Sequence, residues 1–194
     1  WELLYQSKWD SDGYPVGVVQ TLVPNGTEWT DSFSISRRLN KQRSCSHHKS
    51  VYPKFCFVDP RFTEKTDFNL MQQRAFTVLL YGVNMFCASG SATFFDGILF
   101  NALHELAETL VPVKEDQKPP KANLLFWSSI ITNAVFGTFK TKDVIPDVFI
   151  DQLIAYYGVD YYAVYQILSF ALLRYNLADK DPFLQVLGLN AFKL

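Results

Sequence analysis

Several features that would assign this chain to a class at once are scarce or absent. It has three cysteines in 194 residues, too few for the disulfide framework of small secreted domains. Its formal net charge is −1, so no overall field attracts nucleic acid or an anionic membrane. Its best apolar stretch is interrupted by Gln72, Gln73 and Arg74, which argues against a membrane-spanning helix there. We therefore expect an intracellular protein that does not use a membrane and for which nucleic acid is not the main partner.

Apolar residues are abundant, and their spacing predicts helices. Hydrophobic residues make up 48% of the chain, enough for one domain with a substantial core and too many for a disordered chain. Between Asp67 and Phe86 the apolar residues recur every three to four positions, the period of one helical face. A break of small residues follows at 87–92, and a second amphipathic pattern runs from Thr93 to Leu110. Asp67 is a suitable N-cap for the first of these two helices.

The rest of the chain falls into two unlike parts. After a polar linker at 112–120, further helices are predicted at 122–139, 146–157, 160–177 and 183–189. Asp160 is the expected cap of the long one, and Gly158 is placed to end the helix before it. Residues 1–66 are interrupted repeatedly by proline and glycine, and Val16–Val23 reads as a short strand or an extended arm. The predicted fold is an all-α bundle over residues 67–194 with an irregular N-terminal extension over residues 1–66.

Three residues of the central region are the candidate catalytic groups. Cys87 falls in the small-residue break, just ahead of a predicted helix N-terminus, where the helix dipole favours an anion such as a thiolate. The alternative is a core cysteine without reactivity, because free cysteine is among the most buried residue types. His104 and Glu108 are four residues apart on the second helix and can face one point. Two ligands do not make a catalytic metal site, so neither a metal nor a cofactor is predicted.

A second cluster of metal-ligand residue types lies in the N-terminal extension. It consists of Cys45, His47, His48 and, after a gap, Cys56. Structural zinc sites usually present paired ligands on both sides of a longer loop, whereas here the second side supplies one cysteine. A zinc site, a Cys45–Cys56 disulfide and an incidental loop all remain open.

Basic residues gather just before that cluster, at Arg37, Arg38 and Arg43. The ordinary interpretation is a solvated basic segment. A patch that docks a phosphate, a partner protein or a nucleic acid is the alternative.

The order of the helical pieces resembles the AhpD-like, or carboxymuconolactone decarboxylase-like, family over about residues 65–180. Arg74 precedes Cys87 on the first helix, a short helix ends at Gly158, and a longer one ends near Asn176. The resemblance implies a helical bundle that assembles into a homo-oligomer. Redox-active members carry Cys-x-x-Cys followed by a histidine, whereas here Gly90 and Phe94 stand at the corresponding positions.

The resemblance therefore implies an oligomeric protein without the redox pair and with weak or no peroxidase activity. One alternative is an enzyme, decarboxylase-like or thiol-dependent, that uses Cys87 with His104 and Glu108 on a small organic substrate. Another is a binding module for a partner or a nucleic acid built on the basic patch. The last three residues, 192–194, are similar to a peroxisomal address if Leu194 is the true C-terminus.

Overall fold

The computed structural model describes residues 14–22, 27–28, 30–63, 65–89, 94–110, 126–132 and 145–193. This part is mostly helical, as predicted, but the prediction of an all-α protein is not confirmed. Residues 17–58 belong to the extension that was expected to be irregular apart from Val16–Val23, and they contain two small sheets of two strands each. The division of the chain at residue 66 stays a prediction. The elements are β1 (Gly17–Gln20), β2 (Ser32–Arg37), β3 (Gln42–His47), β4 (Phe55–Val58), α2 (Phe68–Ser89), α3 (Phe94–Leu110), α5 (Ile145–Tyr157), α6 (Tyr161–Ala178) and α7 (Pro182–Leu187).

Some predicted features fall outside the described residues. These are the linker at 112–120, the small residues at 90–93, and the two ends of the predicted helix at 122–139, of which residues 126–132 are helical. Leu194 is outside as well, so nothing in the structure supports the peroxisomal prediction. Among the described residues, no helix combines the length and the apolar character that crossing a bilayer requires.

The two sheets differ in the direction of their strands. β2 and β3 form an antiparallel hairpin whose register runs from Ser32 opposite His47 to Arg37 opposite Gln42. Lys41, between them, adopts a left-handed conformation with φ 49°. β1 and β4 are parallel, with Gly17 opposite Phe55. Parallel strands need a crossover connection, and the β2–β3 hairpin occupies that connection.

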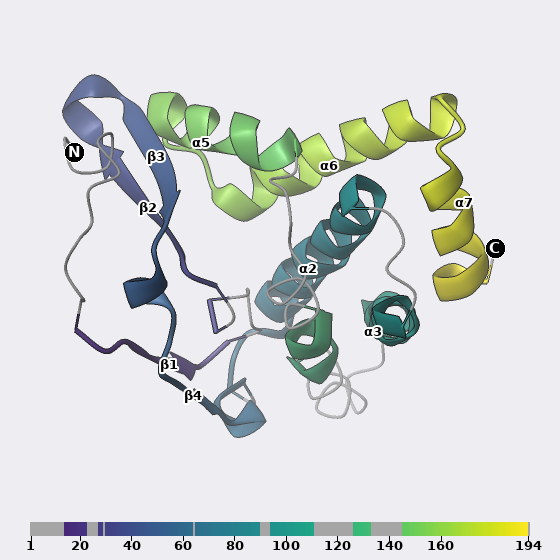
Figure 1. Ribbon diagram of the computed structural model, residues 1–194, viewed down its shortest axis with the longest axis horizontal. Helices are drawn as coiled ribbons and strands as arrows, with labels where there is room; N and C mark the ends of the chain where they lie inside the picture. The colour runs from purple at the N-terminus through teal and green to yellow at the C-terminus, as the bar shows by residue number, and fades with distance from the viewer. Residues whose placement is uncertain are drawn as a thin grey trace.

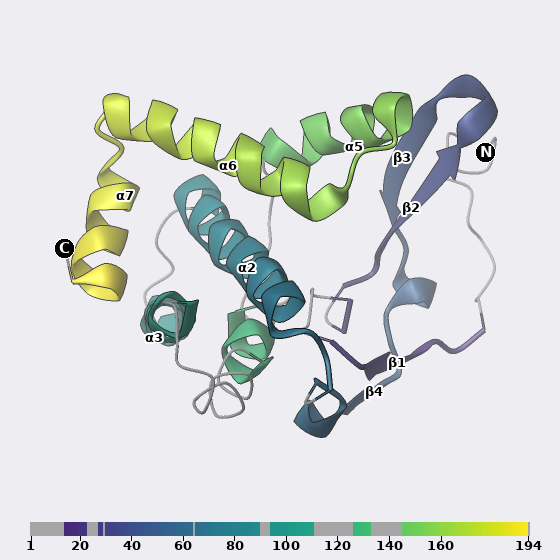
Figure 2. The same cartoon turned by 180° about the vertical axis from the view of Figure 1, so that it is seen from behind.

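The helix α2 lies at the centre of the helical part (Figures 1 and 2). It contacts α3, α6 and α7, and its apolar stripe is almost completely buried, as the spacing predicted. Burial of such side chains stabilises a fold by about 1.5–3 kcal/mol each. The main buried cluster takes side chains from α2, α3 and the C-terminal segment: Met71, Ala75, Val78, Leu79, Val83, Met85, Phe86, Leu99, Leu103, Leu106, Leu187 and Ala191.

A row of polar side chains joins α2 to α6. Such groups are costly to bury unless they are hydrogen-bonded. We call these residues the α2–α6 polar seam. Its contacts are Arg74 Nη1 to Tyr162 Oη at 2.6 Å, Gln166 Nε2 to Thr77 Oγ1 at 2.9 Å, and Asn84 Nδ2 to Ser169 Oγ at 2.9 Å.

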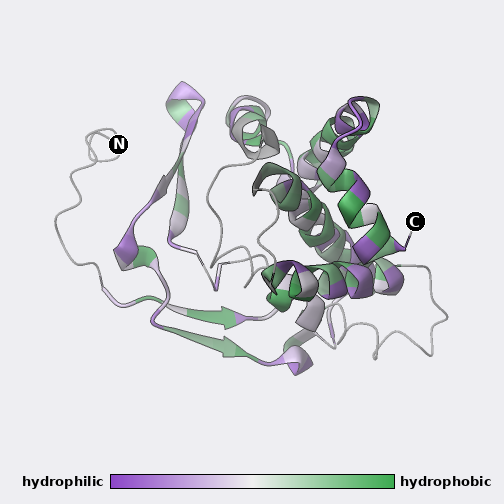
Figure 3. Ribbon diagram, turned by 45° about the vertical axis from the view of Figure 1, so that its right-hand side comes forward, coloured by the Kyte–Doolittle hydropathy of each residue, from purple (hydrophilic) through white to green (hydrophobic). Residues whose placement is uncertain are grey.

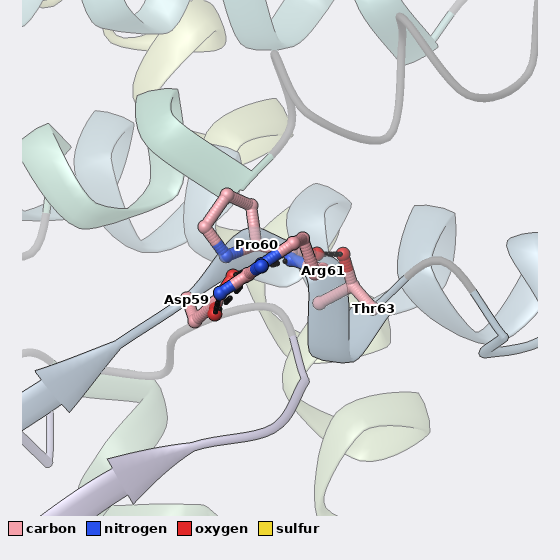
Figure 4. A network of polar contacts seen from close by, with 4 residues as sticks. All are labelled: Asp59, Pro60, Arg61 and Thr63. Atoms are coloured by element: carbon pink, nitrogen blue, oxygen red, sulfur yellow. Dashed lines mark hydrogen bonds and ion pairs between the residues drawn. The ribbon is translucent and has the colours of Figure 1, made fainter.

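A compact turn links β4 to α2 (Figure 4). The Asp59 carboxylate accepts hydrogen bonds from the backbone N–H of Arg61 at 3.0 Å and from its Nε at 2.9 Å. Thr63 Oγ1 donates to the Pro60 carbonyl at 2.6 Å. The hydrogen bonds from Arg61 favour the ionised carboxylate and hold the pKa of Asp59 below its usual value. The turn thus fixes the direction in which the chain leaves the sheet and enters the helical part.

The junction between α5 and α6 forms as the sequence predicts. Gly158 has φ +65°, the left-handed conformation that glycine adopts without strain. Asp160 is the N-cap of α6, and its Oδ1 accepts a hydrogen bond from the backbone N–H of Ala163 at 3.0 Å. Both predicted signals are confirmed.

We expect Asp160→Ala to lower the free energy of unfolding by about 1 kcal/mol, because a backbone donor of α6 loses its cap. The matched control is Asp179→Ala, which removes an exposed carboxylate from the other end of the same helix. A negative charge there opposes the helix dipole, so the control should leave stability unchanged or slightly higher. Urea unfolding followed by circular dichroism measures both. Equal losses in the two variants would contradict the assigned cap.

Candidate functional site

Cys87 lies in the last turn of α2, not ahead of the next helix. α2 extends through Cys87 to Ser89, and the C-terminal end of a helix disfavours an anion. Burial of the thiol, with a smaller contribution from the Asp181 carboxylate, raises its pKa to about 12. The expectation of a lowered pKa, which assumed a helix N-terminus, is therefore wrong. The raised pKa favours the other interpretation, a core cysteine without reactivity. A catalytic role for Cys87 stays a prediction without support from this geometry.

His104 connects α3 to the C-terminal segment. Its Nδ1 lies 2.9 Å from the carbonyl oxygen of Ala191. A carbonyl oxygen only accepts hydrogen bonds, so Nδ1 carries the proton. Ala191 lies ten residues beyond Asp181, with α7 and the start of the π-helix Gly188–Phe192 between the two positions. The Asp181 carboxylate, which acts on the Cys87 thiol only through its charge, and the Ala191 carbonyl, which contacts His104, thus lie at different positions along that segment.

Glu108 is exposed on α3, one turn beyond His104. Catalytic roles for His104 and Glu108 also stay predictions.

The residues of the N-terminal cluster are engaged in separate contacts. Arg43 Nε and Cys45 Sγ each donate to a different oxygen of Asp151 on α5, both at 2.7 Å. Arg43 also donates to two serine hydroxyls of β2, so it is not free to bind phosphate. His47 Nδ1 lies 2.8 Å from Asp31 Oδ1. The three cysteines are free, so the Cys45–Cys56 disulfide does not form.

A surface pocket of about 260 Å³ opens beside β4. Its polar lining comes from Glu28, Lys54 and Cys56, and its apolar lining comes from Tyr52, Pro53, Phe55, Val58 and Ile130. A small set of polar groups in an apolar hollow is typical of ligand sites. We regard this pocket as the candidate functional site.

The buried carboxyl group of the pocket belongs to Glu28. Its side chain is shielded from solvent, and its Oε2 accepts a hydrogen bond from Gln20 Nε2 at the end of β1. Burial, and then the negative charge of Glu28, raise the pKa of the Cys56 thiol, so this thiol stays protonated at neutral pH. Sequence reasoning missed Glu28, because its burial depends on the pairing of strands that are far apart in the chain.

The comparisons with known proteins give a fold but no family. No family model matches the chain, and a search of curated proteins finds no match. Among solved structures, the chain superposes along its whole length on the NADH-dependent butanol dehydrogenase A of Thermotoga maritima, with a TM-score of 0.82 and 16% identity. It also superposes along its whole length on YqhD of E. coli K-12, a structural-genomics protein of unknown function, with a TM-score of 0.83 and 21% identity.

A third similar structure is described as an iron-containing alcohol dehydrogenase. It has a TM-score of 0.66 and 17% identity, over 84% of this chain and 44% of the other. The chain spans half of the butanol dehydrogenase and half of YqhD. At these identities the likeness establishes the fold alone.

These matches correct the resemblance to the AhpD-like family, which is wrong. The fold is that of dehydrogenases, so an AhpD-like or decarboxylase-like protein with residual peroxidase activity is not supported. The other two interpretations, a thiol-dependent enzyme built on Cys87 and a basic binding module, gain nothing from the comparisons.

The side chains of the described residues do not fit an iron site. All three histidines and all three cysteines lie in the described part, and within that part no three His, Cys, Asp or Glu side chains gather to hold a metal. His47 contacts Asp31, and His104 contacts Ala191. The α2–α6 polar seam consists of neutral groups and one guanidinium, which repels a cation. No step of a reaction is therefore derived through iron.

We expect Cys87 to resist alkylation in the folded protein. At pH 8, iodoacetamide should modify it at least roughly a hundredfold more slowly than in the urea-unfolded chain, because almost no thiolate forms when the pKa is about 12. Mass spectrometry of the peptides measures each site separately, with the exposed Cys45 as the internal reference. Equal rates at Cys87 in the folded and unfolded states would contradict the buried, protonated thiol.

We expect Glu28→Gln to move the pH profile of Cys56 alkylation to lower pH. The substitution keeps the shape of the side chain and removes the negative charge that raises the pKa of Cys56. Only part of the shift should disappear, because burial is its larger cause. Asp31→Asn is the control, since Asp31 contacts His47. A Cys56 profile that moves equally in both variants would refute the direct effect of Glu28.

Proposed function

We propose that this chain is the helical portion of a nicotinamide-linked oxidoreductase that interconverts small alcohols and aldehydes. The single observation that carries the proposal is the superposition of the whole chain on half of the NADH-dependent butanol dehydrogenase. The match to YqhD, again over the entire chain, supports the same fold independently. In such a reaction the nicotinamide supplies or accepts a hydride, and the protein binds and orients the two reactants.

The pocket beside β4 supports a binding role for this chain. The Glu28 carboxylate can accept hydrogen bonds from ligand hydroxyls, and the Lys54 ammonium can donate to hydroxyls or attract an anionic group. The walls formed by Tyr52 and Phe55 offer apolar contact to a ring. These are the contacts that part of a nucleotide cofactor, or a small polar substrate, requires.

The chain does not supply a complete dinucleotide site. Its nine glycines include no G-x-G-x-x-G run, the loop that lets a helix N-terminus approach a pyrophosphate. The phosphates of a dinucleotide would therefore be bound by a part of the protein outside these residues. This agrees with a chain that spans half of its structural neighbours.

Assembly into a homo-oligomer is a further part of the proposal. Tyr156, Tyr157 and Tyr175 are large and exposed, and tyrosine is favoured where one end of the ring is dry and the other wet. Light scattering at micromolar concentration tests this, and a monomeric mass would count against it.

Turnover should be measured on the polypeptide encoded by the complete reading frame that contains this chain. We expect oxidation of NADH, followed by its absorbance, when butanal is added, and reduction of NAD⁺ with butanol. Lys54→Ala should raise the KM for the cofactor about tenfold, which corresponds to the loss of one hydrogen bond of about 1.4 kcal/mol from the charged Lys54 ammonium to a cofactor hydroxyl. Lys49→Ala is the matched control, because Lys49 is exposed in the neighbouring turn and does not line the pocket.

Two results would contradict the proposal. One is a folded polypeptide, verified by circular dichroism, that transfers no hydride between either nicotinamide cofactor and aliphatic aldehydes or alcohols. The other is an equal rise in KM in the Lys54 and Lys49 variants, which would remove the pocket from the binding site.

A further inference from the structure

Arg74 is a charged residue whose capacity for hydrogen bonds is mostly unused. It lies half-buried in the first two turns of α2, and a guanidinium has five N–H groups to donate. One of them, on Nη1, donates to Tyr162 Oη at 2.6 Å in the α2–α6 polar seam. The Nε of Arg74 is shielded from solvent and has no hydrogen-bond partner. Buried polar groups in proteins are nearly always paired, so an unpaired one requires a specific explanation.

Arg74 also differs from the other arginines of the chain, all of which lie in the described residues. Arg43 is paired with Asp151, and Arg61 is paired with Asp59. The remaining arginines are exposed to solvent: Arg37, Arg38 and Arg174. Within the described part of the chain, Arg74 is thus the one arginine that is partly removed from water without an acidic partner. A charge that is removed from water normally has a counter-charge, and its absence here points to an anionic ligand.

The contacts of Arg74 hold its guanidinium in one orientation. The guanidinium carbon lies 4.4 Å from the centre of the Tyr162 ring, in a cation–π contact that accompanies the hydrogen bond to the hydroxyl. The Tyr162 ring is itself packed edge to face against Tyr161, with ring centroids 5.4 Å apart. These contacts engage Nη1. In a planar guanidinium the N–H groups of Nε and Nη2 point in the same direction along another edge, and no hydrogen bond of the described structure uses that edge.

The unused edge of Arg74 fits a carboxylate better than a phosphate. Its two parallel N–H groups match the two oxygens of a carboxylate, which arginine binds bidentately. The neighbouring members of the seam are neutral and already engaged, because Gln166 Nε2 donates at 2.9 Å both to Thr77 Oγ1 and to the Gln73 carbonyl. The seam therefore offers a single positive charge. One carboxylate balances that charge, whereas a phosphate dianion would keep an uncompensated negative charge.

Aromatic rings lie beside the guanidinium and can contact the body of a ligand. Figure 3 shows the helices as mostly apolar, with short hydrophilic segments between. The rings continue from Tyr161 to Tyr165 and on to Tyr81, with centroids 5.8 Å and 6.2 Å apart. Tyr165 is fully buried, whereas Tyr161 is 36% exposed. A partly exposed ring close to a cation suits a ligand whose anionic group is attached to an apolar body.

We propose that Arg74, oriented by Tyr162, binds a small organic carboxylate with an apolar body, for which benzoate is the simplest probe. The carboxylate oxygens accept hydrogen bonds from Nε and Nη2 and supply the counter-charge that the described residues lack. Because Arg74 as a whole is half-buried, the ligand approaches from the accessible side of the residue, and the long side chain turns to present Nε. This site is separate from the pocket beside β4, whose lining includes no residue of α2 or α6. It goes beyond the proposed function and does not depend on it.

Isothermal titration calorimetry with benzoate tests the proposal on the polypeptide encoded by the complete reading frame. Arg74→Gln should weaken benzoate binding about a hundredfold, because the charge and the paired donors are both lost. Arg74→Lys should weaken it about tenfold, since an ammonium keeps the charge but cannot bind bidentately. Tyr162→Phe keeps the ring and removes the hydroxyl that orients the guanidinium, which should weaken binding about fivefold.

The matched control is Arg174→Gln, which removes the same charge from an exposed position on α6 and should leave benzoate binding unchanged. Circular dichroism verifies that each variant is folded. A second measurement needs no substitution, so it decides the question even if Arg74→Gln does not fold. Phenylglyoxal modifies arginine side chains, and benzoate should slow the modification of Arg74 about tenfold while leaving that of Arg174 unchanged. Mass spectrometry of the peptides follows the two sites separately.

Three outcomes would overturn the proposal. The first is equal affinity for benzoate in the unsubstituted protein and in a folded Arg74→Gln variant. The second is the absence of both a binding heat and protection of Arg74 from phenylglyoxal at millimolar benzoate. The third is tighter binding of inorganic phosphate than of benzoate, which would assign the guanidinium to a phosphate group. Because none of these measurements involves NADH or an aldehyde, failure of this proposal is distinguishable from failure of the proposed function.

Discussion

The structure depends on α2 having two kinds of surface at once. One side is an apolar stripe that packs on α3 and α7, and another side carries the polar seam to α6. Apolar packing alone tolerates small sliding of one helix past another, whereas a seam of specific hydrogen bonds does not. A shift of α2 by one residue would leave the Asn84 amide without Ser169 and would turn Phe86 away from the core. The seam thus sets the register in which the apolar contacts are made.

The helices could be predicted from the sequence because their signals are local. Periodic apolar residues identified α2 and α3, and single residues such as Gly158 and Asp160 marked where helices end and begin. The end of α2 was misplaced because small residues at 87–89 do not reveal whether a helix continues through them. For Cys87 this error reversed the expected effect of the helix dipole, from the favourable N-terminal end to the unfavourable C-terminal end.

The sheets were harder because their signals are partly non-local. The alternation of serine with Phe33 and Ile35 in β2 is typical of a strand, but the arginines next to it are equally typical of a solvated basic segment. β4 is a short apolar run between Lys54 and Asp59 that periodicity cannot distinguish from a loop. Its parallel pairing with β1, and with it the burial of Glu28, arises from contacts between distant segments. The pocket beside β4 therefore could not have been found by inspecting motifs.

The wrong resemblance to the AhpD-like family and the poor fit of the described residues to an iron site have a common explanation. A short helix, a glycine and a longer helix occur in many helical domains, because each piece obeys the same capping rules. The order of helices therefore carries little information about ancestry or chemistry. Conversely, a dehydrogenase fold can persist at 16–21% identity while the side chains that would bind a metal are absent from the described residues. A backbone is retained by packing, whereas a ligand set is retained only by the chemistry it serves.

The contact between His104 and Ala191 has a consequence for how the C-terminal segment responds to acidity. Histidine usually makes a contact pH-sensitive, since an imidazole that accepts a hydrogen bond loses that ability when it gains a proton. Here the ring nitrogen facing the carbonyl is a donor in the neutral imidazole and remains a donor in the imidazolium. Protonation would occur at the other nitrogen and would leave the bond in place. The hydrogen bond therefore links α3 to the C-terminal segment in both charge states of the ring, and the imidazolium would make the stronger bond.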